Sequence, residues 1–370
     1  MFSRQVVSMV AAILVASGVW GSAAASASRS PGALPRHNFA YADSYRGWPV
    51  APTHRQHPIR GGFLDPRYPE RVYHWGIDVN VRDDRPERGA PPGRTHRVYA
   101  VEGGVVRYAR DGGTPCLHRR VELGHFSYWH VDPTVRAGQA VHAGQMIGWT
   151  CQGAWHVHLG EWAVVRGYRV WVNPLHRGGK IAPYADTAAP LAPAISFYAP
   201  ADPPAFGTRL DPNRLAGVVD ARASVSDPQS FRGWMVGPLE ALHADHHPYE
   251  LRVRMTRLRT GRTWTWTVFR SDIWLGEQAP PFGTPLPFTH HFAQGTDGKP
   301  KTPDCLRRRA AARTNPPSCD GDYAFHLFGT QRGRFWDTRL VPNGRYRFAV
   351  TAIDVRGNRT SATAEATVAN

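Results

Sequence analysis

Short runs of alternating apolar and polar residues, separated by glycine and proline, recur along this chain of 370 residues. Examples are RVYAVEGGVVRYA and AWHVHLGEWAVV in the first half, and ELRVRMTRL, TWTWTVF and GRYRFAVTAIDVRGN in the second. This period of two is typical of half-buried β-strands, whereas the helical period of 3.6 is scarce. In the last run, Tyr346, Phe348, Val350 and Ala352 would share one buried face. The sequence therefore predicts a mainly β protein built from antiparallel strands.

Proline and alanine divide the chain into two predicted domains. Residues 182–204 read APYADTAAPLAPAISFYAPADPP, a composition typical of an extended, semi-rigid linker. We expect a first domain over residues 48–181, preceded by a flexible tail over residues 28–47. A second domain would fill residues 205–370, and its final hairpin is typical of an immunoglobulin-like or fibronectin-like β-sandwich.

The first residues, MFSRQVVSMVAAILVASGVWGSAAASAS, predict export. Arg4 supplies a short positive segment, Val6 to Trp20 is apolar, and small residues follow it. This order is typical of a secretory signal peptide, here residues 1–27, and a retained anchor is the alternative. No later apolar run approaches the ~20 residues of a membrane-spanning helix, so we expect no transmembrane span in the mature chain.

The chain carries 45 Lys and Arg against 29 Asp and Glu, a formal net charge of +16. A basic excess of this size favours anionic partners such as nucleic acid, anionic membrane or anionic cell-wall polymer. Because export makes nucleic acid a poor partner, we expect the cell wall and no specific nucleic acid.

Histidine is the residue type that most suggests chemistry, with 18 in the chain. His156-Val157-His158 lies in an alternating run, so both imidazoles would project from the same face of a strand while Trp155, Val157 and Leu159 face a core. Such a pair suits one metal ligand and one acid/base group. The alternative is a strand with two surface histidines.

A second pattern, His74-Trp75-Gly76-Ile77-Asp78, places an imidazole and a carboxylate four residues apart. Both groups are zinc ligands, although such pairs are often merely hydrogen-bonded to each other. Together the two patterns supply three protein ligands and leave a fourth position open for water. That composition is typical of a catalytic zinc site rather than a structural one.

Two further segments lie between these patterns, Tyr128-Trp129-His130 and the stretch Gly138 to Gln145, which reads GQAVHAGQ. With all four in this order, the chain resembles the lysostaphin/LytM-type zinc metallopeptidases over roughly residues 48 to 180. That family has a duplicated-hybrid-motif fold and cleaves peptide bonds of bacterial peptidoglycan, in the stem peptide or its cross-bridge.

The resemblance implies a role for each motif residue. His74, Asp78 and His158 would bind Zn²⁺, and His130 and His156 would be the acid/base pair that orients water and stabilises the developing oxyanion. No HExxH glutamate is present, so neutral histidines would have to take the proton and return it to the leaving amine.

This chain also departs from the family pattern. The family usually has a proline before the His-x-His and an acidic residue two positions after it. Here Trp155 precedes the motif and Glu161 comes three positions after it. These differences concern the shape of the cleft and the detail of the substrate, and leave the ligand positions in place.

Four cysteines allow two bridges in an exported protein. Because neighbours in sequence lie on the same side of the linker, we expect Cys116–Cys151 in the first domain and Cys305–Cys319 in the second. The GQAVHAGQ stretch alone also resembles lipoyl or biotinyl carrier domains. Those need a displayed lysine, and the first lysine here is Lys180.

Other groups of residues allow weaker hypotheses. The alternative in each case is an ordinary loop, a set of solvated charges or packing in the core. An accessory metal site is suggested by His243, His246, His247 and Glu250, and a site within a loop by His290 and His291. A surface that binds anionic polymer is suggested by Arg307, Arg308 and Arg309, and a surface that binds sugar rings by Trp264 and Trp266.

Two rivals to the enzyme hypothesis follow from the same sequence. One is a non-catalytic protein that binds the cell wall or a partner on a peptidase fold. The other is a basic, polyanion-binding adhesin whose second domain is the active part.

Overall fold

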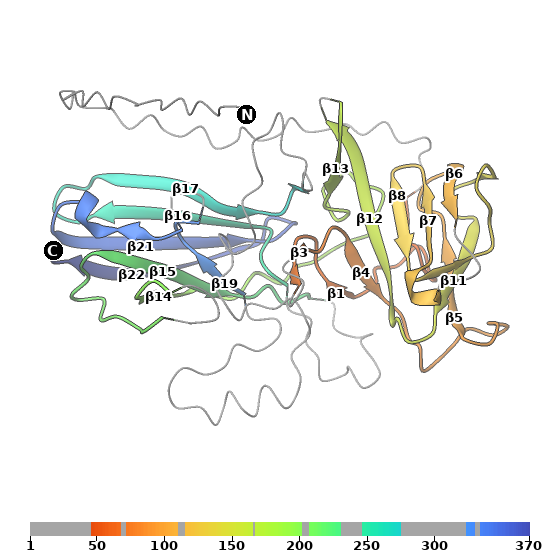
Figure 1. The fold of residues 1–370 in the computed structure, drawn as a ribbon, viewed down its shortest axis with the longest axis horizontal. Coiled ribbons are helices and arrows are strands. Elements are labelled where there is room, and N and C mark those ends of the chain that lie inside the picture. The colour runs from red at the N-terminus through yellow and green to blue at the C-terminus, as the bar shows by residue number, and fades with distance from the viewer. Residues whose placement is uncertain are drawn as a thin grey trace, which may run out of the picture. The chain divides into compact units, whose positions relative to one another are not determined.

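The computed structural model describes residues 46–67, 72–109, 115–165, 167–201, 207–230, 246–274, 323–329 and 334–370. All of them belong to one compact unit. It is mainly β, and its helical elements in the described ranges are two 3-10 turns, Cys116–His118 and Thr338–Leu340 (Figure 1). None of the helices in these ranges has the length and apolar character needed to cross a membrane. The predicted signal peptide, residues 1–27, lies outside the described residues.

The largest sheet has nine strands, and every neighbouring pair in it is antiparallel. Its main path, in spatial order, is β1 (Ile59–Gly61), β4 (Ile77–Asn80), β12 (His156–Val165), β8 (Phe126–Trp129), β7 (Arg120–Leu123), β6 (Gly104–Ala109) and β10 (Ala140–Val141). Two more strands, β13 (Tyr168–Val172) and β18 (Ile273–Trp274), continue from β12. Figure 1 shows β12 as a long strand beside β4 and β8.

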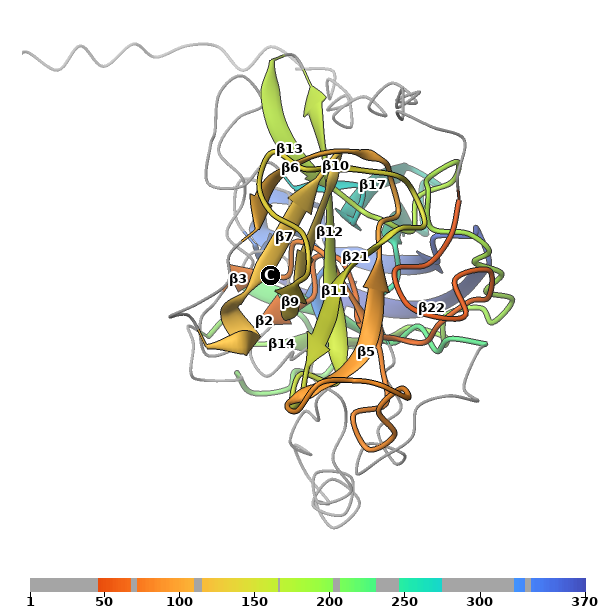
Figure 2. The same cartoon turned by 90° about the vertical axis from the view of Figure 1, so that its right-hand side faces the viewer.

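The alternation along β12 determines which side chains enter the core. Val157 and Leu159 are fully buried, as the sequence predicted, whereas Trp155 is half-buried and precedes the strand. A three-stranded sheet shares this core through Val98 and Ile147. Its strands are β5 (Arg94–Tyr99), β11 (Met146–Cys151) and β9 (Val131–Pro133), and Figure 2 shows β5 and β11 side by side. A small hairpin, β2 (Pro66–Arg67) and β3 (Val72–Tyr73), precedes β4.

The rest of the described chain forms two four-stranded antiparallel sheets. One contains β14 (Ala194–Tyr198), β15 (Val218–Val225), β19 (Tyr323–His326) and β20 (Trp336–Asp337). The other contains, in order, β17 (Thr263–Arg270), β16 (Glu250–Arg257), β21 (Gly344–Ile353) and β22 (Arg359–Val368).

Aromatic side chains fill the space between these two sheets. Phe348 and the other three predicted core residues of β21 are all fully buried, which confirms that shared face. The ring of Phe197 on β14 lies 5.5 Å from that of Phe348 between centroids, and the ring of Phe325 on β19 lies 5.3 Å from that of Phe269 on β17. Rings from both sheets therefore pack into one core.

Strand pairing occurs within the predicted linker and between the two predicted domains. Strand β14 lies inside residues 182–204 and pairs along its length with β15, because the alternating segment Ala194–Tyr198 buries Phe197 among the aromatic rings. In addition, β18, from the predicted second domain, pairs with β13 of the first. Ordered pairing therefore begins before residue 205 and crosses between the two predicted domains.

Candidate metal centre

Strand pairing brings the two separate histidine motifs together. On β12, His158 lies directly opposite Asp78 of β4 on one side and opposite Trp129 of β8 on the other. Directly paired residues of antiparallel strands point to the same face of the sheet. His74 precedes β4 and His130 follows β8, and their ring centroids lie 4.6 and 6.5 Å from that of His158, so the five predicted ligand and acid/base residues lie together.

His74, Asp78 and His158 form one buried group that could hold a metal ion. The Oδ1 atom of Asp78 lies 3.0 Å from Nε2 of His74 and 3.1 Å from Nδ1 of His158. The two imidazole nitrogens are 2.7 Å apart. Each of the three residues is less than a tenth exposed.

The hydrogen bonds around this group decide which atoms can act as ligands. Nδ1–H of His74 donates to the carbonyl oxygen of Gly62 at 2.7 Å, because a carbonyl can only accept. Nε2 of a neutral His74 therefore carries a lone pair that faces the Asp78 carboxylate. Two such acceptors repel each other unless a proton or a cation lies between them. The donor set thus fits a divalent metal of the kind that imidazole and carboxylate bind.

A second pair of imidazoles lies beside this group. The ring centroids of His130 and His156 are 4.7 Å apart, in an edge-to-face arrangement. Nδ1–H of His156 donates to the carbonyl oxygen of Ala154, and Nδ1–H of His130 donates to that of Leu117, both at 2.5 Å. Each ring therefore keeps Nε2 free to exchange a proton, and Nε2 of His156 lies 3.4 Å from Asp78 Oδ1.

Burial sets the protonation of these groups. Desolvation lowers the pKa of His156 to about 3 and that of His158 to about 4, and it also lowers the pKa of His130. Burial alone would raise the pKa of Asp78, but the neighbouring His156 and His74 hold it well below its usual range. At neutral pH these three imidazoles are thus uncharged and Asp78 is an ionised carboxylate, the forms that accept protons and bind metal.

The disulfide between Cys116 and Cys151 holds His130 in place. Its two Cα atoms are 5.6 Å apart, and the bridge is the one that the sequence predicted; Cys305 and Cys319 lie outside the described residues. The Cys116–His118 turn supplies the Leu117 carbonyl to the His130 ring, and Cys151 N–H donates to the His130 carbonyl at 2.9 Å. His130 has a φ of 63°, uncommon for a residue with a side chain, so these contacts select its conformation.

We expect the double variant Cys116→Ser/Cys151→Ser to keep its metal ion and to lose turnover. The ligands do not touch the bridge, whereas His130 depends on both of its ends. The chain-entropy model assigns such a bridge about 4 kcal/mol of stability, so activity should be measured well below the lowered Tm. Metal analysis and peptide hydrolysis on one preparation would check this. Full turnover in the folded variant would show that the bridge does not position His130.

Gly76 lets the backbone before β4 pass the His158 ring. A Cβ atom at this position would lie 2.6 Å from the carbonyl oxygen of Leu159 and 2.7 Å from Nε2 of His158. No Cβ tolerates such distances, and the Leu159 carbonyl belongs to a central strand that cannot shift easily. The glycine of the first histidine motif is therefore required by the packing of a metal-ligand candidate.

Accordingly, Gly76→Ala should weaken metal binding by displacing the His158 ring. A matched control is Gly138→Ala, where a Cβ atom would meet nothing within 4 Å although φ is positive. Titration with zinc and a competing chelator would measure both variants. Equal zinc affinity in Gly76→Ala and the wild type would contradict this account of the glycine.

Glu161 does not belong to the metal centre. It lies on the face of β12 opposite to His158 and is fully buried, with Oε1 3.2 Å from Nε2 of His176. Glu161 is therefore a buried group that contacts His176 in the core, and it does not take the place of the acidic residue expected just after the His-x-His.

Residues far away in the sequence help to hold His74 in place, and the sequence did not predict these contacts. The carboxylate of Asp65 is fully buried and accepts from the backbone N–H of Gly62 at 2.5 Å, next to the carbonyl that holds His74. The hydroxyl of Tyr323 on β19 donates to Asp65 at 3.0 Å, and His247 Nε2 lies 3.4 Å from it. Residues of the predicted second domain therefore brace a ligand of the first.

Tryptophan and arginine side chains occupy the same sheet face and were also missed. Trp162 of β12 pairs with Trp171 of β13, and the Arg169 guanidinium lies over both rings, 4.5 and 5.1 Å from their centroids. The sequence did contain a signal for this position, because His158 and Trp162 are four residues apart on an alternating strand and therefore lie on one face. This part of the face is basic and aromatic.

The weaker clusters have structural roles where they are described. His247 also bonds to the Phe63 carbonyl at 2.8 Å, and Glu250 pairs with Arg252 at 2.7 Å. Trp266 Nε1–H donates to the Leu327 carbonyl, so Trp266 packs against the core rather than forming an open platform. The remaining residues lie outside the described part: His243, His290, His291, Arg307, Arg308 and Arg309.

No protein-family model matches the chain, and no curated protein matches it.

Proposed function

We propose that this chain is a secreted, zinc-dependent endopeptidase that hydrolyses peptide bonds of bacterial peptidoglycan, in the stem peptide or the cross-bridge. The observation that supports this most is the convergence of His74, Asp78 and His158 into one buried group with the rings of His130 and His156 beside it. A metal-binding trio next to two neutral imidazoles is a composition suited to hydrolysis.

The proposal extends to the fold of the two halves. Residues 48–181 would be a duplicated-hybrid-motif peptidase domain of the lysostaphin/LytM type. The two four-stranded sheets would be an immunoglobulin-like accessory domain. Their packed aromatic core is consistent with a β-sandwich.

In this mechanism a bound zinc ion would supply a water molecule of lowered pKa and would polarise the scissile carbonyl. His156, held by Ala154, accepts the proton of the attacking water at Nε2. The proton then passes from His156 to Nε2 of the adjacent His130, held by Leu117, which donates it to the oxyanion and on to the leaving amine. The C–N bond breaks as the amine gains that proton. Asp78 stays ionised throughout, so its negative charge remains in the site during the reaction.

The experiment that tests this function follows new amino groups released from purified peptidoglycan. We expect release by the metal-loaded protein, loss after treatment with a chelator, and recovery when zinc is added back. Binding to the wall without release of amino groups would instead support the non-catalytic wall-binding protein.

We further propose that the net charge of +16 draws the protein to anionic cell-wall polymer. Binding of the full-length protein to purified sacculi should weaken steeply between low salt and physiological salt, because exposed charges are screened beyond ~10 Å at 0.1 M. Sacculi stripped of anionic polymer are the control. Binding that is indifferent to both salt and stripping would contradict the electrostatic account.

A further inference from the structure

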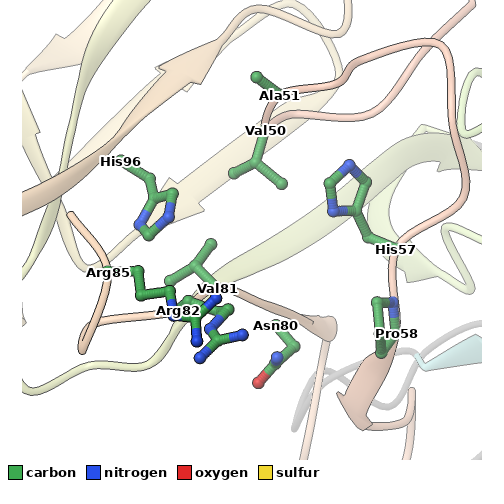
Figure 3. Close-up of a pocket in the computed structure, with 9 residues that line it drawn as sticks. All are labelled: Val50, Ala51, His57, Pro58, Asn80, Val81, Arg82, Arg85 and His96. Atoms are coloured by element: carbon green, nitrogen blue, oxygen red, sulfur yellow. The ribbon is translucent and has the colours of Figure 1, made fainter. Parts of the chain in front are cut away.

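A pocket lies at the end of β4, the strand that carries Asp78 (Figure 3). Asn80, which lines it, lies two residues after Asp78 and directly opposite His156 of β12. Residues two apart on a strand share a face and are ~7 Å apart. Asn80 therefore belongs to the same sheet face as the metal centre, about two residues of extended peptide away from Asp78.

Asn80 brings an unused hydrogen-bonding group to this pocket. The residue is only 7% exposed, and its side-chain amide forms no hydrogen bond with any residue of the described ranges. The amide atoms reach the surface, so they can bond to a ligand that enters the pocket. His96 adds another unused group, because its Nδ1 is buried without a partner among the described residues.

The charge of the pocket is positive. Arg82 and Arg85 line it, and Figure 3 shows both beside Asn80 and His96, with no acidic residue on the walls. Arg82 is paired with Asp84 at 2.9 Å, whereas no carboxylate of the described chain forms a salt bridge with Arg85. Burial lowers the pKa of His57, to about 4, and of His96, so neither adds charge at neutral pH. Arg85 is thus the arginine of the pocket without a salt bridge in the described chain, although the neighbouring Asp84 still attracts it.

We propose that this pocket binds a carboxylate of the substrate peptide, about two residues from the bond that is cleaved. The Arg85 guanidinium and the Asn80 amide are donors that match the two oxygens of a carboxylate. The inference rests on the proposed peptidase function, since it assumes that a peptide lies across the metal centre. Peptides carry such a group at the C-terminus or on an acidic side chain.

Two pairs of fluorescently labelled peptides distinguish these sources. The first pair is trialanine labelled at its N-terminus and the C-terminal amide of that peptide; the second is N-terminally labelled alanyl-glutamyl-alanine amide and its glutamine counterpart. Binding to the full-length protein would be followed by fluorescence anisotropy, with chelator present to prevent metal-dependent cleavage. In at least one pair, the carboxylate form should bind roughly ten-fold more tightly. The pair that shows the difference identifies the source.

Arg85→Gln should reduce that ratio to about two-fold or less, and Arg85→Glu should invert it. The matched control is Arg88→Gln, which removes an exposed arginine of the same loop that does not line the pocket. Equal binding within both pairs in the wild type, or a full ratio in Arg85→Gln, would overturn the proposal.

Failure of the peptidase function would look different. A protein that prefers carboxylates but never releases amino groups from the wall would support the carboxylate pocket and contradict the peptidase function. A protein that cleaves the wall without preferring carboxylates would support the peptidase function and contradict the carboxylate pocket.

Discussion

Replacement of His158 by alanine should abolish metal binding and hydrolysis together. The variant removes one of three protein ligands, the one that lies between Asp78 and the ring of His74 in the centre of the sheet. The two remaining ligands would leave the site too weak to retain zinc through purification. We therefore expect metal content near zero and hydrolysis at the detection limit.

Metal analysis, peptide hydrolysis and thermal unfolding on the same preparation would check this expectation. His142→Ala is the matched control, because His142 is exposed and takes no part in the site. The control should keep both metal and turnover. A folded His158→Ala protein with stoichiometric zinc would remove His158 from the ligand set.

The second large effect is a loss of turnover without a loss of metal, expected for His130→Ala. His130 is not a ligand candidate, and its ring faces His156. Removal of one acid/base group typically costs roughly 10²- to 10⁴-fold in rate. His156→Ala should lose as much and also bind the metal more weakly, because its Nε2 lies 3.4 Å from Asp78.

His118→Ala provides the control for His130, since it removes an exposed imidazole from the adjacent turn. It should retain turnover within about two-fold, as surface substitutions usually do. Undiminished hydrolysis by a zinc-loaded His130→Ala protein would take His130 out of the mechanism.

Local pattern predicted the strands and the shared face of His156 and His158, because the period of a strand depends on neighbours alone. It could not predict the register that puts His158 opposite Asp78, 80 residues away in sequence. That pairing was expected only through the resemblance to a known family. The geometry of the trio thus depends on long-range strand order, which motif spacing does not contain.

The sequence was least informative where residues far apart support each other. Proline and alanine suggested a linker across β14, although burial of Phe197 outweighs that composition. The contacts of Tyr323 and His247 with Asp65 leave no local signal, since each residue reads as ordinary core or loop. Removal of the second half would expose Asp65, so a truncated first half is a poor test of the catalytic roles.

The central claim is best tested on the wild-type protein with purified peptidoglycan at neutral pH, by measuring its bound metal and the amino groups it releases. We predict about one zinc ion per chain and a steady release of new amino groups that chelation stops. A correctly folded protein that binds no zinc, or that holds zinc at this site and releases no amino groups, would contradict the peptidase assignment.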